Sequence, residues 1–263
     1  MLIFRICSQI QSTRGWHMPS RGRINRNMCL VGPDNQEILS ELAVINRMLP
    51  LADASVLELG CGGAEKTRAI AERTDVASIT AVEIDKTQHQ KNLEITDLPK
   101  VRFQSFGAED IQAENNSYDI VMMFKSLHHV PANDLDAALK EIYRVLKPGG
   151  YSYISEPVFA GAYNEIMRLF HDEEIVRKQA FEAVKKIVDS GVFKLAEEFF
   201  FKNKLRLRSF EQYETGILGV THTNHQINDE TMNSIKKLFL SNESDEGFVF
   251  EIPNRIDLLR KPS

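Results

Sequence analysis

The sequence has little cysteine and no long apolar run. Its three cysteines, Cys7, Cys29 and Cys61, are odd in number and far apart among 263 residues, which suits neither a disulfide framework nor a structural zinc site. No apolar stretch approaches the roughly 18 residues that a membrane-spanning helix needs. Glycine (14) and proline (9) are too scarce for collagen-like repeats or a long linker. These absences predict a soluble globular chain in a reducing compartment, the cytoplasm.

Acidic residues and lysine are missing from residues 1–33, which contain five arginines. The rest of the chain, with 27 basic and 37 acidic residues, carries a net charge of −10. A body this acidic is a poor nucleic-acid binder, because phosphate contacts need basic patches. We therefore expect a small-molecule partner. Residues 1–33 are predicted to be a flexible extension, either a transit-like segment or a stretch upstream of a start at Met18 or Met28.

Short apolar runs alternate with helical patterns from residue 34 onward. Asp34 and Glu37 together form a helix-start signal. Later helices are expected near 65–73, 86–96 and 133–146. The apolar runs are too short for helices and are bounded by turn residues, as buried parallel strands are; they are Val56–Leu59, Ile79–Val82, Val101–Phe103, Ile120–Phe124 and Tyr151–Ile154. This alternation predicts a three-layer α/β fold around a mostly parallel sheet over residues 34–156.

The alternation of strand and helix patterns ends after Glu156. A long apolar helical face follows over 175–188 and ends at Ser190-Gly191, and Lys194–Phe201 is a possible strand. We expect residues 157–246 to form a helical lid and substrate region on the edge of the sheet. Residues 247–263 return to a period of two and predict a final strand, which Pro253 would place at an edge or a bulge.

The most informative segment is Val56-Leu-Glu-Leu-Gly-Cys-Gly-Gly-Ala-Glu65. A buried strand ends in an acid, and a glycine turn then opens a helix, so that a ligand can approach the backbone where no Cβ intervenes. This glycine turn is compatible with two ligands, a dinucleotide or S-adenosylmethionine. Glu58 and Glu65 would repel a pyrophosphate, whereas Glu58 would attract the amino group of S-adenosylmethionine. The charges therefore favour S-adenosylmethionine.

A second acid supports this choice of cofactor. Glu83 ends the strand Ile79–Val82 and lies 21 residues after Gly62, near the offset at which a carboxylate binds ribose hydroxyls. Asp85 is the better candidate for the cap of the following helix. Two strand-end acids, Glu58 and Glu83, are thus expected to face one crevice.

These segments resemble class I S-adenosylmethionine-dependent methyltransferases, in particular the ubiquinone and menaquinone biosynthesis subgroup. The resemblance runs from about Asp34 to Glu156. It rests on motifs in the expected order, namely Glu58-Leu-Gly-Cys-Gly-Gly63, Val82-Glu-Ile-Asp85, Ala108-Glu-Asp-Ile111, Ser117-Tyr-Asp-Ile-Val121, Leu127-His-His-Val130 and Arg144-Val-Leu-Lys-Pro-Gly-Gly150.

The resemblance implies a Rossmann-like sandwich with a seven-stranded sheet whose last strand is antiparallel. It also implies a set of cofactor contacts: Glu58, Gly60, Cys61, Gly62, Glu83, Ile84, Ala108, Glu109 and Phe124. An aspartate that contacts the adenine amino group in many relatives aligns with Gly107 here. Glu109 or backbone atoms are expected to take over that contact.

The histidines offer the candidate catalytic groups. His128 and His129 follow the fourth expected strand, where the crevice opens, and His129 is the candidate general base. Cys61 has no neighbouring base and is interpreted as filler of the glycine turn. His222 and His225 lack a nearby carboxylate or cysteine cluster, so a polar loop is favoured and no metal is expected.

We therefore expect an enzyme that moves the sulfonium methyl group to a small-molecule acceptor by in-line displacement. Two alternatives stay open. One is a cofactor-binding protein of the same fold without catalysis, and the other is a methyltransferase acting on protein or RNA. The segment Phe124–His129 carries no Asn-Pro-Pro-Tyr or Asp-Pro-Pro-Tyr motif, which argues against methylation of nucleic-acid bases.

Overall fold

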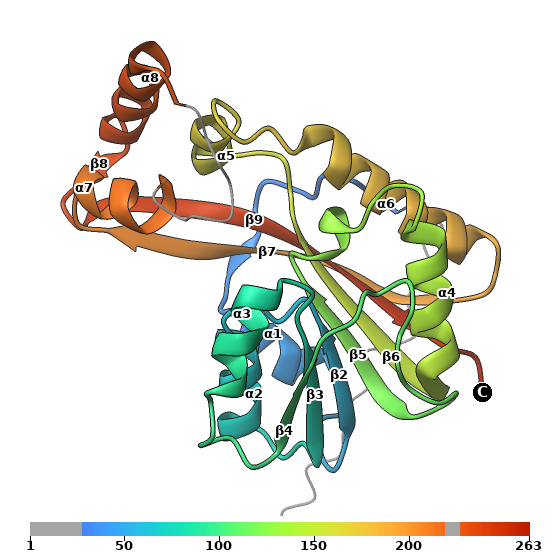
Figure 1. The fold of residues 1–263 in the computed structure, drawn as a ribbon. Coiled ribbons are helices and arrows are strands. Elements are labelled where there is room, and N and C mark those ends of the chain that lie inside the picture. The colour runs from blue at the N-terminus through green and yellow to red at the C-terminus, as the bar shows by residue number, and fades with distance from the viewer. Residues whose placement is uncertain (1–27, 219–226) are drawn as a thin grey trace, which may run out of the picture.

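The computed structural model describes residues 28–218 and 227–263. Cys7, His222, His225 and the predictions for residues 1–27 lie outside these ranges. The described chain forms one sheet of nine strands with helices on both faces (Figure 1). The strand order is β1-β7-β9-β6-β5-β2-β3-β4, and the short strand β8 pairs with β9.

The strands and helices alternate as the sequence predicts. The strands are β1 (Glu37–Ile38), β2 (Ser55–Leu59), β3 (Ser78–Val82), β4 (Val101–Gln104), β5 (Tyr118–Phe124), β6 (Leu146–Pro157), β7 (Lys194–Leu207), β8 (Glu243–Ser244) and β9 (Gly247–Arg260). The helices are α1 (Glu41–Met48), α2 (Glu65–Arg73), α3 (Lys86–Leu93), α4 (Leu135–Val145), α5 (Ala162–Met167), α6 (Glu174–Asp189), α7 (Phe210–Tyr213) and α8 (Asp229–Leu240), with a 3₁₀ turn η1 (Leu127–His129) and a π turn η2 (Glu214–Leu218).

The sheet topology confirms the predicted fold class. Strands β2 to β6 run parallel to one another, and β9 is antiparallel to both β6 and β7. Seven strands therefore form the expected sheet with an antiparallel last strand. The two-residue strands β1 and β8 are additions that the sequence pattern did not predict, because so short a strand leaves no periodic signal.

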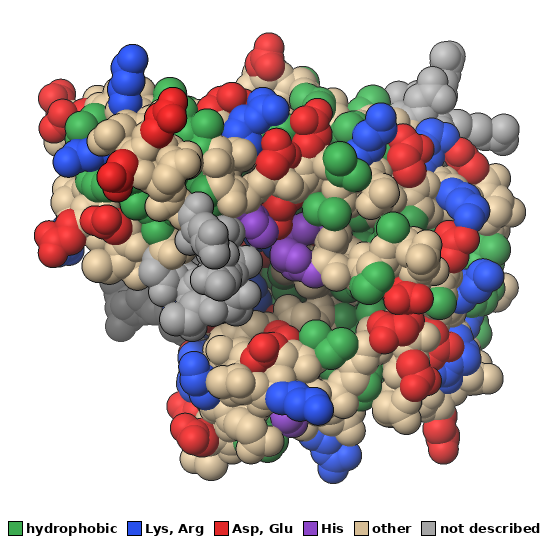
Figure 2. Space-filling view, turned by 45° about the horizontal axis from the view of Figure 1, so that its top comes forward, with side chains coloured by type: hydrophobic (Ala, Val, Ile, Leu, Met, Phe, Trp, Pro, Cys, Tyr) green, Lys and Arg blue, Asp and Glu red, His purple; other side chains and the backbone are tan. Residues whose placement is uncertain are grey.

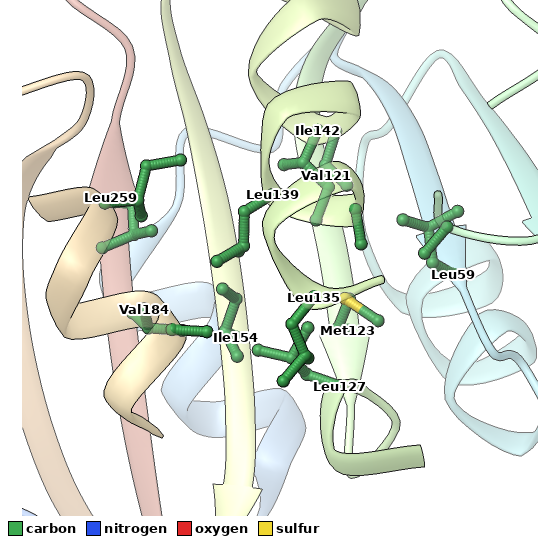
Figure 3. Packing of buried hydrophobic residues seen from close by; sticks show 14 of the residues in the cluster. Leu59, Val121, Met123, Leu127, Leu135, Leu139, Ile142, Ile154, Val184 and Leu259 are labelled. Carbon is green, nitrogen blue, oxygen red and sulfur yellow. The ribbon is translucent and has the colours of Figure 1, made fainter. Parts of the chain in front are cut away.

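Alternation along each central strand explains the three layers. In β5, Val121 and Met123 belong to the apolar cluster that contains residues of α4 and α6, whereas Ile120 and Met122 belong to the cluster that contains residues of α1 and α2. A strand covered on both faces reads as a continuous apolar run, which is why β5 has no polar position at its centre. Figure 3 shows Leu139 of α4 packed among the strand residues of the first cluster.

Strands β7 and β9 extend well beyond the rest of the sheet. Both have 14 residues, and they pair along their length from Lys194–Arg260 to Leu207–Phe248. Helices α7 and α8 lie along this extension at the upper left of Figure 1. A separate apolar cluster, which includes Tyr213, Phe239 and Phe250, holds them there. The aromatic residues of this region are thus mainly core residues.

Two expectations about local structure need correction. The first helix does not begin at Asp34, because Glu37–Ile38 pairs with β7 and the Ser40 side chain caps α1 by accepting from the Ala43 N–H. Pro253 does not mark an edge strand. It lies in β9 just beyond Asn254, whose pairing with Pro157 is the last with β6. The Pro253 carbonyl accepts from the Val158 N–H, so the missing proline N–H faces the side on which pairing with β6 has ended.

The packed part of the chain begins earlier than residue 34. Met28 is buried in the cluster beneath α4 and α6, and the Cys29 N–H donates to the Glu198 carboxylate. Among the described residues, no helix has the length and apolar character required to cross a bilayer.

Candidate active site

A cavity of about 780 Å³ opens at the carboxyl ends of β2, β3 and β5. Ligands of open α/β sheets bind at this edge, because the loops that follow parallel strands meet there. Of the predicted site residues, eight line the cavity: Gly60, Gly62, Glu83, Ile84, Ala108, Glu109, Phe124 and His129. Glu58, Cys61 and His128 lie outside the lining. The volume falls within the roughly 300–1,000 Å³ of small-molecule sites.

The glycine turn after β2 forms one wall of the cavity. A Cβ at Gly60 would lie 2.6 Å from the Ser126 Cβ, and the backbone φ of Gly60 is +75°, so a side chain there is excluded on both counts. A Cβ at Gly62 would instead meet nothing within 4 Å. The turn thus presents bare backbone to the cavity at Gly62, as a close-fitting ligand requires.

Glu83 holds the glycine turn and also faces the cavity. One of its carboxylate oxygens accepts from the Gly62 N–H at 2.8 Å and the other from the Asp85 N–H at 2.9 Å. Asp85 caps α3, as predicted, by accepting from the Gln88 N–H. The half-buried Glu83 carboxylate is therefore fixed at the cavity wall with lone pairs left for ligand hydroxyls.

Glu58 is placed differently from the sequence expectation. Its side chain is buried and accepts a hydrogen bond from the Thr67 hydroxyl of α2 at 2.7 Å. Burial raises the pKa of Glu58 to about 7, against the lowering effect of Thr67. Glu58 ties the first turn of α2 to the end of β2 and so supports the glycine turn from behind.

The Glu58 environment predicts a pH-dependent stability. Its pKa is about 7 in the folded protein and about 4.5 unfolded, so the folded state binds more protons between these values and stability falls as pH rises through this window. The loss is on the order of 3 kcal/mol for a shift of this size. Glu58→Gln, which keeps an acceptor for Thr67, is expected to flatten this part of the urea-unfolding profile. If the free energy of unfolding fell equally steeply with pH in Glu58→Gln, the assignment of this pH dependence to Glu58 would be wrong.

Cys61 is inert in this arrangement. Its thiol is buried beside Asn92, whose side chain donates to the Gly62 carbonyl at 2.8 Å. Burial and the nearby acids Glu58 and Glu83 raise the pKa of Cys61, so the nucleophilic thiolate is not formed near neutral pH. The geometry therefore supports the interpretation of Cys61 as filler of the turn.

Glu109 occupies the space beside Gly107. A Cβ at Gly107 would lie 2.0 Å from a Glu109 carboxylate oxygen. Both residues line the cavity together with Ala108 and Phe106. The Glu109 carboxylate thus fills the space that a side chain at position 107 would occupy. This agrees with the expectation that Glu109 can stand in for the missing aspartate at position 107.

The two histidines of η1 have different environments. His129 lines the cavity, and burial followed by the charge of His128 lowers the pKa of His129, so its imidazole is neutral near pH 7. His128 is buried, and its Nδ1 pairs with the Glu156 carboxylate. Burial alone lowers the pKa of His128, but the carboxylates of Glu156 and Glu173 outweigh it and raise this pKa to about 9.

Sequence reasoning missed a polar cluster around His128. Glu173 lies 3.5 Å from His128 Nε2 and also accepts from Arg177 of α6, while His171 Nε2 is 2.8 Å from Glu173. One nitrogen each of His128 and His129 and one oxygen of Glu173 lie within 4.8 Å of one another. Glu156 follows the expected strand Tyr151–Ile154, as Glu83 follows Ile79–Val82, and this repeated position of an acid after a strand was the signal available in the sequence.

Lys125 is a second residue that the sequence analysis did not single out. It lines the cavity between Phe124 and Ser126 and adopts a left-handed backbone conformation with φ of 53°. Burial lowers the pKa of Lys125. A non-glycine residue in this conformation is uncommon and often marks a functional site, because the surrounding structure has to enforce it.

Comparison with known proteins confirms the predicted resemblance over the cavity-forming segment. Residues 56–150 match the family described as "Methyltransferase domain". An O-methyltransferase from Pyrenophora dematioidea is 34% identical over 121 residues, which cover 44% of each chain. The ubiquinone biosynthesis O-methyltransferase of Xanthomonas oryzae pv. oryzae (strain PXO99A) is 35% identical over 119 residues, covering 43% of this chain and 47% of that protein. The chain thus matches less than half the length of these relatives.

Solved structures extend the likeness in fold. A Bacillus halodurans C-125 protein superposes with a TM-score of 0.60 at 19% identity, covering 86% of this chain and all of its own. Phosphoethanolamine N-methyltransferase 2 of Haemonchus contortus, solved in complex with S-adenosyl-L-methionine, gives a TM-score of 0.53 at 19% identity over 84% of this chain and 52% of that one. These TM-scores show a shared fold.

Proposed function

We propose that this chain, which contains a methyltransferase domain over residues 56–150, transfers a methyl group from S-adenosylmethionine to a hydroxyl oxygen of a small molecule. One observation carries the proposal. The open glycine turn, the fixed Glu83 carboxylate and the neutral His129 all line the same cavity. The O-methyltransferases among the relatives support oxygen as the accepting atom.

The residues of the cavity fit this cofactor. The space left by the missing side chain at Gly62 admits the methionine portion against bare backbone. Glu83 can accept hydrogen bonds from two ribose hydroxyls, and exposed Ile84 offers an apolar surface for the adenine ring. To Glu109, beside Gly107 in the cavity lining, we assign the role of accepting from the adenine amino group. Glu83 and Glu109 also disfavour a pyrophosphate in this cavity, a role that the sequence analysis gave to Glu58 and Glu65.

The protein needs to form no covalent bond with the methyl group or the acceptor in this reaction. When bound, S-adenosylmethionine supplies a methyl group already activated by the sulfonium charge. The glycine turn, Glu83 and Ile84 orient the donor side of the cavity. Phe124, Val130 and Pro131 line the same cavity and exclude water. Alignment in a dry site accounts for most of the expected rate, because displacement needs the reacting atoms in line. His129 provides a nitrogen lone pair where an acceptor hydroxyl would lose its proton.

The acidic body and a cavity of small-molecule size favour a small molecule over protein or RNA. A cofactor-binding protein without catalysis is the second candidate, because the glycine turn and Glu83 could bind the cofactor without any methyl transfer. An assay of S-adenosylhomocysteine release over a panel of hydroxylated metabolites separates the two. Turnover with at least one acceptor is expected, and tight cofactor binding without turnover across the panel would favour the second candidate.

Glu83→Ala tests the cofactor assignment directly. Loss of a charged acceptor for ribose hydroxyls costs about 1.5–3 kcal/mol, so affinity for S-adenosylmethionine in calorimetry is expected to fall roughly tenfold or more. Glu94→Ala, which removes an exposed acid just after α3, is the matched control and should bind normally. Equal affinity of Glu83→Ala and the wild-type protein would refute the assignment.

The region 157–246 is proposed to determine which acceptor enters. It contributes Glu173 and Arg177, and the N-terminal part of α6 lies next to η1, which carries the two histidines. When product cofactor and acceptor are both bound, amide hydrogen exchange in α5 and α6 is expected to slow. Unchanged exchange in both helices would show that this region does not close on the site.

A further inference from the structure

Lys125 brings a positive charge into the cavity without a counter-ion. It lines the cavity on the loop after β5, and its side chain is accessible there. Among the described residues, no carboxylate forms a hydrogen bond or an ion pair with its ammonium group. Arg177 of α6, by contrast, binds the Glu173 carboxylate at 2.6 Å. A ligand that covers an ammonium group without supplying an anion leaves a desolvated, unpaired charge, which is costly.

The two acids that act on Lys125 are already engaged by other partners. Glu41 and Glu156 affect the lysine charge only through space and form no hydrogen bond with it. The Glu41 carboxylate accepts from the Tyr153 hydroxyl at 2.7 Å. Glu156 pairs with His128. Neither acid is therefore placed to neutralise Lys125 when a ligand fills the cavity.

The surroundings of Lys125 carry additional positive charge. Burial among protein atoms lowers the pKa of Lys125, and the charges of Lys66 and Arg177 lower it further, so that the two acids do not outweigh them. A lysine with a close counter-ion has its pKa raised instead. S-adenosylmethionine adds to this positive potential, because it carries two positive charges and one negative charge. An anionic acceptor offsets this excess, whereas a neutral acceptor leaves it in place.

The backbone places Lys125 on the same loop as the histidine assigned to the acceptor. The Lys125 N–H donates to the Ser155 carbonyl of β6 at 2.7 Å, and the following residues form η1, where the His129 N–H donates to the Ser126 carbonyl at 3.2 Å. Lys125 and His129 therefore flank one short turn, and both line the cavity. Figure 2 shows histidine side chains in the hollow on this face of the molecule.

The acids of the cavity lining lie on other segments. Glu83, Asp85 and Glu109 follow β3 and β4, and Asp134 immediately precedes α4. The loops after β3 and β4 are the ones assigned to the ribose and the adenine. A ligand anion is repelled by these carboxylates, so it is disfavoured on that side of the cavity and favoured beside Lys125.

We propose that Lys125 is an anion subsite for the acceptor, and that the acceptor is a hydroxy acid. Such a molecule carries a carboxylate, or a comparably compact anionic group, in addition to the hydroxyl that receives the methyl group. The inference rests on the proposed function, because it names the class of molecule that occupies the acceptor side of the same cavity. Lys125 acts here as a specificity-determining residue, binding the anion while His129 faces the hydroxyl.

Matched pairs of ligands test the requirement for charge without any need for turnover. Each pair consists of a hydroxy acid and its carboxamide, namely salicylate with salicylamide, mandelate with mandelamide and lactate with lactamide. Calorimetry measures their binding to the protein with S-adenosylhomocysteine bound. In at least one pair the acid is expected to bind roughly tenfold or more tightly than the amide, because a charge-assisted hydrogen bond is stronger than a neutral one.

Variants of Lys125 assign that preference to its charge. Lys125→Met removes the charge and keeps an unbranched side chain at the left-handed position, so the affinity for the acid is expected to fall roughly tenfold or more, to that of the amide. Lys125→Arg keeps the charge and should retain the preference. Lys91→Met, which removes a lysine of α3 from the cavity lining, is the matched control and should also retain it.

Three results would overturn the inference. The first is a wild-type protein that binds no acid of the panel more tightly than its amide, and the second is a preference that persists in Lys125→Met. The third is a loss of affinity for S-adenosylhomocysteine in Lys125→Met with the acid preference unchanged, which would pair the ammonium group with the cofactor's own carboxylate. Thermal unfolding of each variant shows whether it is folded.

Failure of the proposed function gives a different result. A protein that binds no S-adenosylmethionine, or that transfers no methyl group to any acceptor, refutes the function. The preference for acids over amides can still be measured on the same protein without cofactor. A Lys125-dependent preference in that experiment would support the anion subsite, and its absence would overturn it.

Discussion

Replacing His129 by alanine is expected to lower the rate of methyl transfer by roughly 100-fold while affinity for S-adenosylmethionine stays within about twofold of the wild type. Removal of a general base that acts on the acceptor proton typically costs this much. The contacts assigned to the cofactor involve Gly62, Glu83 and Ile84, which lie on other loops of the cavity. Single-turnover rates and calorimetry on the same variant provide the measurement.

His89→Ala provides the matched control, because it removes a histidine without touching the cluster. A rate within threefold of the wild type in His129→Ala would show that His129 only packs against His128, whose ring centroid is 4.2 Å away. A parallel loss of cofactor affinity would instead place His129 on the donor side of the cavity. Either result contradicts the assignment of His129 to the acceptor side.

Arg255→Met is expected to destabilise the fold by about 3–5 kcal/mol, because it leaves the buried Asp257 carboxylate without its partner. Arg255 Nε donates to Asp257 at 2.9 Å from two positions along β9, and both side chains are almost completely buried. The guanidinium also lies 4.5 Å from the Phe181 ring of α6. Burial raises the pKa of Asp257, so part of the cost is relieved as pH falls and the carboxyl becomes neutral.

The double variant Arg255→Met with Asp257→Leu is the control for charge burial. Replacing both members of a buried pair by apolar residues is often neutral or stabilising, so most of the lost stability should return. Urea unfolding measures the free energy of unfolding of both variants, and its dependence on urea concentration, the m-value, should stay unchanged. A loss below about 1 kcal/mol in Arg255→Met would contradict the prediction, as would a double variant no more stable than the single one.

Local sequence determined the central elements of this protein. The bounds of β2, β3 and α2 fall within a residue or two of the predicted ranges, because each is an apolar run or a periodic face closed by residues that end it. The Asp85 cap and the glycine turn also follow from local rules, since a cap and a turn are decided by the conformation of a few neighbouring residues.

Tertiary pairing decided where other elements begin and end. Asp34 and Ser40 both carry a side chain able to cap a helix, and the pairing of Glu37–Ile38 with β7 selects Ser40. Strands β7 and β9 extend to 14 residues each because they pair with one another beyond the edge of the main sheet. Such pairing joins residues more than forty positions apart and therefore has no signature in either segment alone.

The sequence by itself determined one wall of the cavity, because its glycine turn and Glu83 lie in short motifs whose spacing is set by a strand and the loop after it. Only the tertiary structure decided the wall that carries the histidines. Glu156 ends β6 and Glu173 precedes α6, and they meet His128 from positions 28 and 45 residues away along the chain. The same packing turns Glu58 inward to Thr67 and out of the cavity. The direction of a side chain at a strand end depends on which hydrogen-bonding groups the neighbouring helix places beside it, and these are fixed only when helices and sheet pack together.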